Sequence, residues 1–334
     1  MDFLKPFQGD LLSVPPLWLM RQAGRCLPEY LKIRAQFPSF LDLVLTPEAA
    51  AEVTLQPVRR FDFDAAILFS DILIIPYALG QQVVFSPKPH LSPLSLEDPE
   101  FGLSLDQIES RLEPIYETVR QVRKNLSPQK ALIGFAGSPF TVASYMLEGS
   151  GKKDFMETKR FAFRAPEAFQ KLLHLISKTT LQYLKAQIDA GVQVVQLFES
   201  AGGCVPWTEL ESWVYGPTSW LVEELKKVSP HTPVIGFPRG LGASVETYVQ
   251  KTRVNGVSLD TTIDLSTLLG VPAVIQGNLD PVVLLEGGPL LKNHVDRICQ
   301  ACSDRPFIFN LGHGVLPETP LSHIEELVFH VRNR

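Results

Sequence analysis

The sequence predicts an α/β fold, a single (β/α)8 barrel of the TIM type that spans residues 1–334 and has its active site at the carboxyl-terminal face of the strands. Three observations favour this fold. Short apolar runs recur along the chain, stretches with helical periodicity separate several of them, and polar residues or glycines follow each run. Strands that alternate with helices are typical of parallel sheets. A doubly wound open sheet is the structural alternative.

The apolar runs predict eight strands, because each is too short for a helix and rich in Val, Ile, Leu and Phe. Strands of a parallel sheet are buried on both faces and therefore have near-continuous apolar sequence. The predicted strands are residues 16–20, 65–70, 131–136, 192–198, 233–237, 254–259, 272–277 and 306–311.

Helix signals lie between these strands. Thr46 is placed to be an N-cap with Pro47 at the first helical position, and Gly191 is placed to end another helix. A further helix opens at the Gly-Ser-Pro turn of GSPFTVASYMLEG. The other predicted helices are residues 46–61, 165–191, 217–228 and 320–334.

The composition excludes some classes of partner. The net charge of −5 argues against a general nucleic-acid surface or a surface for anionic membranes. No run resembles a membrane span of about 20 apolar residues, and the N-terminal residues lack a signal-peptide pattern, so we expect a cytoplasmic protein. The four cysteines are too few and too scattered for a disulfide framework.

Polar residues at the ends of the predicted strands indicate where a site would form. In a barrel these positions converge on one face, where active sites lie. Loops are polar in general, but Arg, Asp, Ser and His gathered on one rim favour a functional interpretation. The residues are Arg21, Ser70–Asp71, Gly137–Ser138, Glu199–Ser200, Pro238–Arg239, Asp260, Asn278, Asp280 and Gly312–His313.

The segment WLMRQAGRCLPEY places Arg21 and Arg25 four residues apart, and Arg34 follows on the next segment. Guanidinium groups stay charged and bind carboxylate or phosphate through paired hydrogen bonds. The cluster therefore indicates a pocket for a ligand with several carboxylates. The alternative is that these arginines form surface salt bridges with Glu29, Asp42 or other acids.

Four other residues are candidates for ligand contact. Asp71, in FSDIL, lies between apolar stretches, where it either accepts N–H groups of a ligand or pairs with an arginine. Tyr145 follows the third predicted strand and points either into the pocket or into the core. Ser200 ends the fourth strand, and His313 lies between two glycines in NLGHG. A structural histidine is the alternative for His313.

Some absences limit the chemistry. No lysine ends a predicted strand, which argues against a Schiff-base aldolase or a pyridoxal-phosphate enzyme. Cys299 and Cys302 form one Cys-x-x-Cys pair, which is a weak zinc signal, and we interpret them as buried helix residues. No G-x-S-x-G hydrolase pattern is evident.

The motifs taken together resemble the uroporphyrinogen decarboxylase family. WLMRQAGRCLPEY, LTPEAAAEVTLQPVRRFDFDAAILFSDIL, GFAGSPFTVASYMLEG, LFES and NLGHG match in order over nearly the whole chain. The resemblance implies a single-domain barrel that forms a homodimer and uses no metal or organic cofactor. It also implies that the four acetate carboxyl groups of a tetrapyrrole, uroporphyrinogen III, leave as CO2 to give coproporphyrinogen III in heme biosynthesis.

The resemblance implies roles for the candidate residues. Arg21, Arg25 and Arg34 match the arginines that meet the acidic side chains of the substrate. Asp71 matches the aspartate that accepts hydrogen bonds from the pyrrole N–H groups. The remaining pocket residues that match are Tyr145, Ser200 and His313. Among all of these we expect Asp71, Arg21 and Tyr145 to be catalytic.

The chain departs from the family pattern at two positions. Cys26 stands where the family commonly has Tyr, and Ala201 stands where it commonly has Trp. We expect Cys26 to be a packing substitute without a catalytic role, with a thiol pKa that nearby arginines could lower.

Two other functions remain open from the residues. A related barrel methyltransferase that activates a thiol with zinc needs His and Cys ligands at the rim, where Cys204 is near one loop. A non-catalytic tetrapyrrole carrier would bind the same ligand without releasing CO2.

Overall fold

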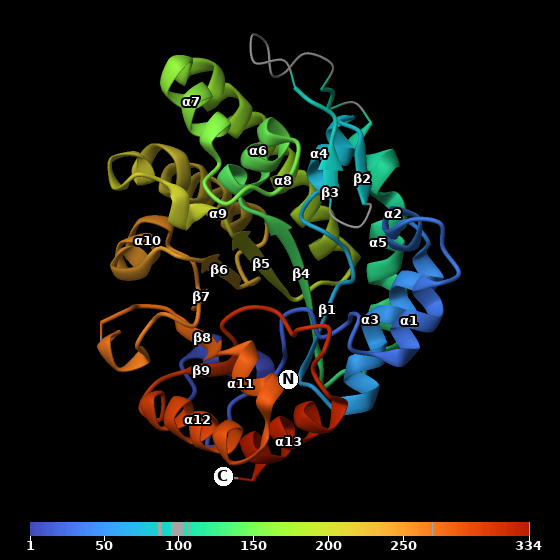
Figure 1. The fold of residues 1–334 in the computed structure, drawn as a ribbon, viewed down its shortest axis with the longest axis vertical. Helices are drawn as coiled ribbons and strands as arrows, with labels where there is room; N and C mark the ends of the chain where they lie inside the picture. Colours follow the sequence, from blue (N-terminus) through green and yellow to red (C-terminus); the bar gives the residue numbers. More distant parts are fainter. Residues whose placement is uncertain (86–88, 95–102, 106, 269, 334) are drawn as a thin grey trace.

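The computed structural model describes residues 1–85, 89–94, 103–105, 107–268 and 270–333. Within these residues, seven parallel strands form one sheet in the order β1-β4-β5-β6-β7-β8-β9. The sheet curls, and helices cover its outer face (Figure 1). Because the strands follow one another in chain order without the reversal that defines a doubly wound sheet, the open-sheet alternative does not hold.

The strands confirm seven of the eight predicted positions. Each is a nearly fully buried apolar run, as expected for a sheet covered on both faces. The strands are β1 (Ala65–Ile67), β4 (Ala131–Gly137), β5 (Val194–Glu199), β6 (Val234–Pro238), β7 (Gly256–Ser258), β8 (Val274–Leu279) and β9 (Phe307–Leu311).

The first predicted strand, residues 16–20, is wrong as a strand. It forms only an isolated parallel bridge between Leu17 and Phe309. Proline precedes it and offers no N–H, and the Leu17 N–H donates to Asp64 Oδ2 at 2.7 Å in place of a neighbouring backbone carbonyl. The segment still touches both edges of the sheet, because the Trp18 N–H donates to Phe309 at 3.4 Å and the Asp64 N–H donates to Leu17 at 2.9 Å.

The helices agree with the predicted positions. Pro47 opens α3 and Gly191 ends α8, although the Thr46 hydroxyl donates to the Asp42 carbonyl and does not cap its own helix. The helices are α1 (Pro28–Arg34), α2 (Phe40–Val44), α3 (Pro47–Phe61), α4 (Ile74–Leu79), α5 (Ile108–Asn125), α6 (Pro139–Glu148), α7 (Met156–Arg164), α8 (Pro166–Ala190), α9 (Gly216–Val228), α10 (Val245–Thr252), α11 (Pro281–Glu286), α12 (Gly288–Ala301) and α13 (Leu321–Arg332).

A small antiparallel hairpin, β2 (Val83–Phe85) with β3 (Pro89–Leu91), lies beside α4 and was not predicted. Its short strands mix exposed and buried positions, so they lack the buried apolar run that marks the main sheet. None of the helices in the described part of the chain is long and apolar enough to cross a membrane.

Candidate functional site

A tight turn after the segment at residues 16–20 holds Arg21. The Met20 N–H donates to Asn310 Oδ1 at 3.0 Å, and the Val315 N–H donates to the Met20 carbonyl at 2.9 Å. These bonds fasten the turn to the end of β9. Arg21 itself has a φ of 60°, a left-handed conformation that is uncommon for a residue with a side chain and clusters at functional sites.

Gly314 makes room for the Arg21 side chain. A Cβ at residue 314 would lie 2.3 Å from Cδ of Arg21, so only glycine fits there without displacing the arginine. A Cβ at Gly24 would meet only the Arg21 carbonyl oxygen at 3.3 Å. The glycine that allows close approach to Arg21 is thus in NLGHG, far along the sequence.

Asp71 follows β1 in the FSDIL segment. Its Oδ1 accepts the Leu73 N–H at 2.8 Å, which fixes the carboxylate in a turn. Desolvation raises the pKa of Asp71 to about 6, while the Leu73 N–H and the charge of Arg21 act in the opposite direction. Among the described residues, Asp71 forms no ion pair with an arginine, although Arg21 lies near enough to influence it.

Tyr145 projects from α6 toward the same charges. Burial raises the pKa of the Tyr145 phenol, Asp71 raises it further, and Arg21 and Arg239 lower it. These mutual influences indicate that Asp71, Arg21 and Tyr145 lie near one another.

His313 follows β9 and is held as a neutral imidazole. Burial lowers its pKa to about 4, and the positive charges of Arg21 and Arg239 act in the same direction. The Gly314 N–H donates to His313 Nδ1 at 2.6 Å, so Nε2 carries the proton and is the donor that remains.

Of the other predicted residues, Arg25 interacts with this group in the described part of the chain, whereas no hydrogen bond or ion pair there joins Arg34 or Ser200 to it. Arg25 is exposed and lowers the pKa of Arg21, which places it beside the group. Arg34 ends α1 and donates to the Phe37 carbonyl at 2.8 Å. Its charge lowers the pKa of Tyr30, and it makes no direct hydrogen bond or ion pair with Asp71 in the described part of the chain. Ser200 follows β5 and is half-buried; in the described part of the chain no hydrogen bond joins its hydroxyl to Asp71 or Arg21.

The surface acids that could have neutralised the arginines have other partners. Glu29 forms a paired hydrogen bond with Arg60 at 2.7 and 3.0 Å, and Asp42 caps α2 by accepting from Ser39. Neither Arg21 nor Arg25 forms an ion pair within the residues that the structure describes. Their charges are therefore available to a ligand.

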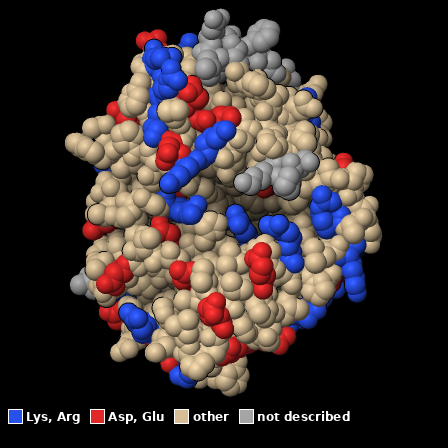
Figure 2. Space-filling view, in the orientation of Figure 1, with Lys and Arg blue, Asp and Glu red and all other residues tan. Residues whose placement is uncertain are grey.

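Arg239 is among the polar strand ends that the sequence places on the rim, but it was not predicted as a ligand-contacting residue. It follows β6 and is exposed at the carboxyl end of the sheet. Its positive charge lowers the pKa of Arg21, Tyr145 and His313. Its position after an apolar run was the available signal, but nothing in the local sequence separates it from an ordinary loop arginine. Basic side chains surround a hollow in the middle of the face seen in Figure 2.

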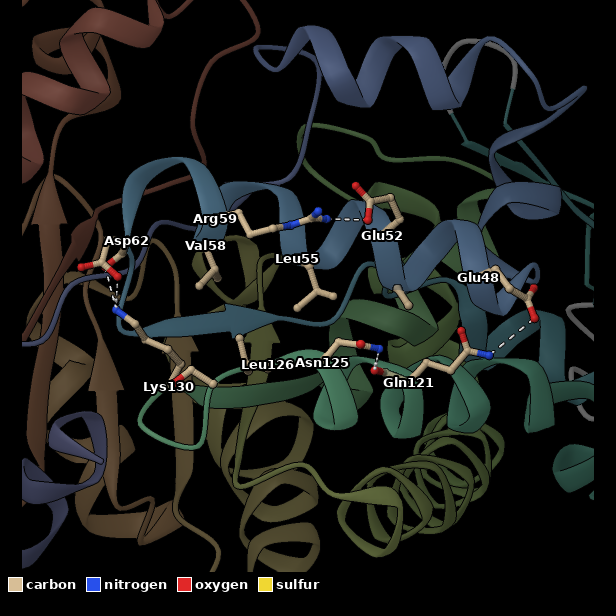
Figure 3. Close-up of a pocket in the computed structure, with 12 residues that line it drawn as sticks. Glu48, Glu52, Leu55, Val58, Arg59, Asp62, Gln121, Asn125, Leu126 and Lys130 are labelled. Carbon is tan, nitrogen blue, oxygen red and sulfur yellow. Dashed lines mark hydrogen bonds and ion pairs between the residues drawn. The ribbon is translucent and has the colours of Figure 1, made fainter.

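A separate groove lies away from this group of residues. A groove of about 670 Å³ lies between α3 and α5, and none of the predicted site residues lines it. Figure 3 shows Arg59 facing Glu52 and Lys130 reaching Asp62 there, the latter pair at 2.7 Å. Both basic groups of this groove thus have an acidic partner.

The cysteines differ from expectation in two respects. Burial raises the pKa of the Cys26 thiol to about 11, so the expected lowering by nearby arginines is wrong. Cys299 lies in α12 but is only half-buried, and the buried Cys302 lies just beyond the helix. Among the described residues, no group of three or more His, Cys, Asp and Glu side chains is gathered to hold a metal ion.

The fold and the site define a parallel α/β protein with an arginine-rich site at the carboxyl edge of its sheet. The family model described as uroporphyrinogen decarboxylase (URO-D) matches residues 1–334. A uroporphyrinogen decarboxylase of Novosphingobium aromaticivorans is 49% identical, covering 98% of this chain and 97% of that protein. One of Rhodospirillum rubrum is 46% identical, covering 99% and 96%. The chain belongs to the uroporphyrinogen decarboxylase family.

The comparison with solved structures concerns the fold alone. A methyltransferase from Methanosarcina mazei superposes with a TM-score of 0.83 at 16% identity, covering 99% of this chain and 97% of that one. A B12-independent methionine synthase from a Shewanella species gives a TM-score of 0.56 at 14% identity, covering 87% and 89%. At such identities the likeness carries no chemistry.

Proposed function

We propose that this chain is a uroporphyrinogen decarboxylase that removes the four acetate carboxyl groups of uroporphyrinogen III as CO2 and yields coproporphyrinogen III. The observation that carries the proposal is a half-buried carboxylate, Asp71, beside Arg21 and Arg25, for which the described part of the chain gives no ion pair. A tetrapyrrole with acidic side chains offers N–H donors for the carboxylate and carboxylates for the arginines.

Asp71 supplies the central electrostatic element. Loss of CO2 leaves an electron pair that needs a sink, and a pyrrole protonated at its ring carbon provides one within the substrate. A carboxylate below the ring accepts the pyrrole N–H groups and stabilises that cation. Its single backbone bond, to Leu73, leaves most of its acceptor capacity for the ligand. Preorganised charge of this kind is usually the largest catalytic contribution.

The arginines hold the carboxylates of the substrate. Arg21, Arg25 and Arg34 are the residues that the family resemblance assigns to this role, and Arg239 joins them by its position. Desolvation lowers the pKa of Arg21, in the direction that proton delivery requires. Tyr145, Ser200 and the neutral His313 offer hydrogen-bond donors around the ring. We leave the identity of the proton donor open.

We also propose that residues 1–334 form one domain, a complete (β/α)8 barrel in which the segment at 16–20 takes the eighth position. Its hydrogen bonds to both edges of the sheet support this. A buried series of side-chain hydrogen bonds also supports it. Trp18 Nε1–H donates to Gln276 Oε1 at 2.9 Å, and Gln276 Nε2–H donates to Gln196 Oε1 on β5 at 3.0 Å. Homodimer formation and a cytoplasmic location remain predictions from the family resemblance and the sequence.

The test is anaerobic incubation of the purified protein with uroporphyrinogen III, followed by oxidation and chromatography of the porphyrins. We expect intermediates with fewer carboxyl groups and then the four-carboxyl product. Binding of the substrate without any loss of CO2 would instead identify a carrier and contradict the proposal.

A further inference from the structure

Glu199 is a buried carboxyl group directly behind the site. It is the last residue of β5, it immediately precedes Ser200, and it is 0% exposed. A fully buried carboxyl group is costly unless other groups satisfy it. It cannot reach a substrate, so its presence calls for a different explanation.

One oxygen of Glu199 is held by two segments at once. The Thr141 hydroxyl donates to Glu199 Oε1, and the Ala201 N–H donates in turn to Thr141 Oγ1 at 3.1 Å. Burial raises the pKa of Glu199, and the Thr141 hydroxyl and the nearby backbone N–H groups of Ala201, Thr141 and Gly202 act in the opposite direction. Thr141 lies in the first turn of α6, whose free N–H groups favour a nearby carboxylate.

The main chain of Glu199 makes a separate attachment. The Arg239 N–H donates to the Glu199 carbonyl at 3.1 Å, and the Gly203 N–H donates to the Arg239 carbonyl at 3.1 Å. This link orients the end of β6 without using the Glu199 side chain. The side-chain carboxyl group of Glu199 thus contacts Thr141, while its backbone carbonyl contacts Arg239.

The second oxygen has no partner of its own. Among the described residues, neither Glu199 Oε2 nor the Tyr248 hydroxyl has a hydrogen-bond partner, and the charge of Glu199 raises the pKa of Tyr248. A Cβ at Gly202 would lie 3.0 Å from Glu199 Cγ, so the turn packs tightly over the stem of the side chain. The site retains this group despite an unsatisfied oxygen.

We propose that Glu199 is a positioning residue of the decarboxylase reaction, whose carboxyl group fastens the start of α6 to the turn after β5 and so sets the relative placement of Tyr145 and Ser200. The inference rests on the proposed function. The main chain at Arg21 and at Arg239 is held by bonds that do not use the Glu199 side chain. That side chain therefore acts on the geometry of turnover more than on the capture of the acidic substrate.

The kinetic test compares Glu199→Ala and Glu199→Gln with the wild type. Loss of the carboxyl group releases Thr141 and the turn, and we expect kcat to fall about 100-fold because small displacements of reacting groups cost that much. KM should change less than threefold, since the Arg239 link uses the main chain. Glutamine keeps an acceptor for Thr141 and should retain kcat within about fivefold.

The matched control is Gln187→Leu. Gln187 is also fully buried and bonds to the Phe135 backbone, at 3.1 Å from its N–H and 3.2 Å to its carbonyl, but it lies away from the site. This variant should lose stability while keeping kcat. Equal losses of kcat in Gln187→Leu and Glu199→Ala at matched stability would overturn the proposal, as would a Glu199→Gln enzyme as slow as Glu199→Ala.

Hydrogen exchange tests the same proposal without activity. Amides at the start of α6 and at residues 200–203 should exchange faster in Glu199→Ala than in the wild type, and at the wild-type rate in Glu199→Gln. Unchanged exchange in Glu199→Ala would overturn the positioning role even if the wild type proved inactive. If Glu199→Ala does not fold, Thr141→Val removes the same hydroxyl bridge and should show the same changes. A wild-type enzyme without turnover would refute the decarboxylase assignment alone.

Discussion

Two regions of the molecule gather charged side chains around a concave surface. The basic side chains form ion pairs in one region and, among the described residues, lack them in the other. In the groove between α3 and α5, Arg59 pairs with Glu52 and Lys130 pairs with Asp62 (Figure 3). At the carboxyl edge of the sheet, the described part of the chain gives Arg21 no ion-pair partner. None of the predicted site residues lines that groove. We therefore assign the candidate site by the arrangement of its charges and not by the presence of a cavity.

The two regions differ in their effect on the stability of the fold. Exposed pairs contribute little to stability and cost little to keep. Partly desolvated arginines placed near one another are unfavourable, and the left-handed backbone at Arg21 is a further cost. A fold retains such an arrangement where a ligand supplies the missing negative charge.

Replacing the carboxylate at the centre of the unpaired region should have the largest effect. Asp71→Asn keeps the shape of the side chain and its acceptor for the Leu73 N–H, but removes the charge that we propose stabilises the cationic ring. We expect kcat to fall about 100- to 1,000-fold, the range for loss of one preorganised electrostatic group. Initial rates of CO2 release would measure it.

The control for Asp71→Asn is its thermal unfolding. Because the asparagine cannot suffer the desolvation that raises the pKa of Asp71, the variant should unfold at the wild-type temperature or above it. Turnover within a few-fold of the wild type would remove Asp71 from the mechanism.

Removing one unpaired arginine should come next. Arg25→Ala takes away one guanidinium group for which the described residues offer no ion-pair partner, so its effect should fall on the substrate. We expect KM to rise about 10- to 100-fold, since hydrogen bonds to charged groups contribute about 1.5–3 kcal/mol. Arg239→Ala offers the comparison at the arginine not predicted from sequence. An unchanged KM in Arg25→Ala would show that this arginine is structural.

Most of the fold could be predicted because a parallel sheet buries both faces, so that strands such as β4 and β9 appear as continuous apolar runs. The segment at 16–20 has the same pattern, yet the Asp64 side chain takes the Leu17 N–H that a strand would use. That competition comes from a distant residue and leaves no local signal.

The site was predictable where the motif and the strand end coincide, as at Asp71 and His313. Arg239 was not, because only the sheet order places it opposite Arg21. The role of Gly314 was hidden for the same reason: its contact with Arg21 joins opposite ends of the chain. Long-range packing of this kind decides which polar strand ends face one another.

A smaller effect concerns stability and pH. Burial raises the pKa of Glu199 from 4.5 to about 7, so the unfolded chain releases this proton at lower pH than the folded chain. The stabilisation is complete below pH 4.5 and is lost as the pH rises toward about 7. Relative to Glu199→Gln, the wild type should lose about 3 kcal/mol of unfolding free energy over that interval, at about 1.4 kcal/mol per pKa unit.

Denaturant unfolding of both proteins at several pH values would measure this difference. Asp71, whose pKa is also raised, makes both proteins less stable as the pH rises. His313, whose pKa is lowered, makes both proteins less stable as the pH falls from 6.5 to about 4. Both contributions cancel in the comparison. A constant difference between the two proteins across this range would mean that Glu199 ionises normally.

The smallest effect on activity and stability should come from a substitution in the groove between α3 and α5. Arg59→Ala breaks an exposed pair whose side chains are 59% and 44% accessible, so stability should change by less than about 1 kcal/mol. Turnover and KM should stay at wild-type values, because the partner left behind, Glu52, remains hydrated and no predicted site residue lines the groove. Thermal unfolding and steady-state kinetics of Arg59→Ala beside Arg25→Ala give the sharpest comparison, since each variant removes one exposed guanidinium group. A KM that rose as much in Arg59→Ala as in Arg25→Ala would mean that net positive charge governs substrate capture, and that the unpaired arrangement at the edge of the sheet has no special role.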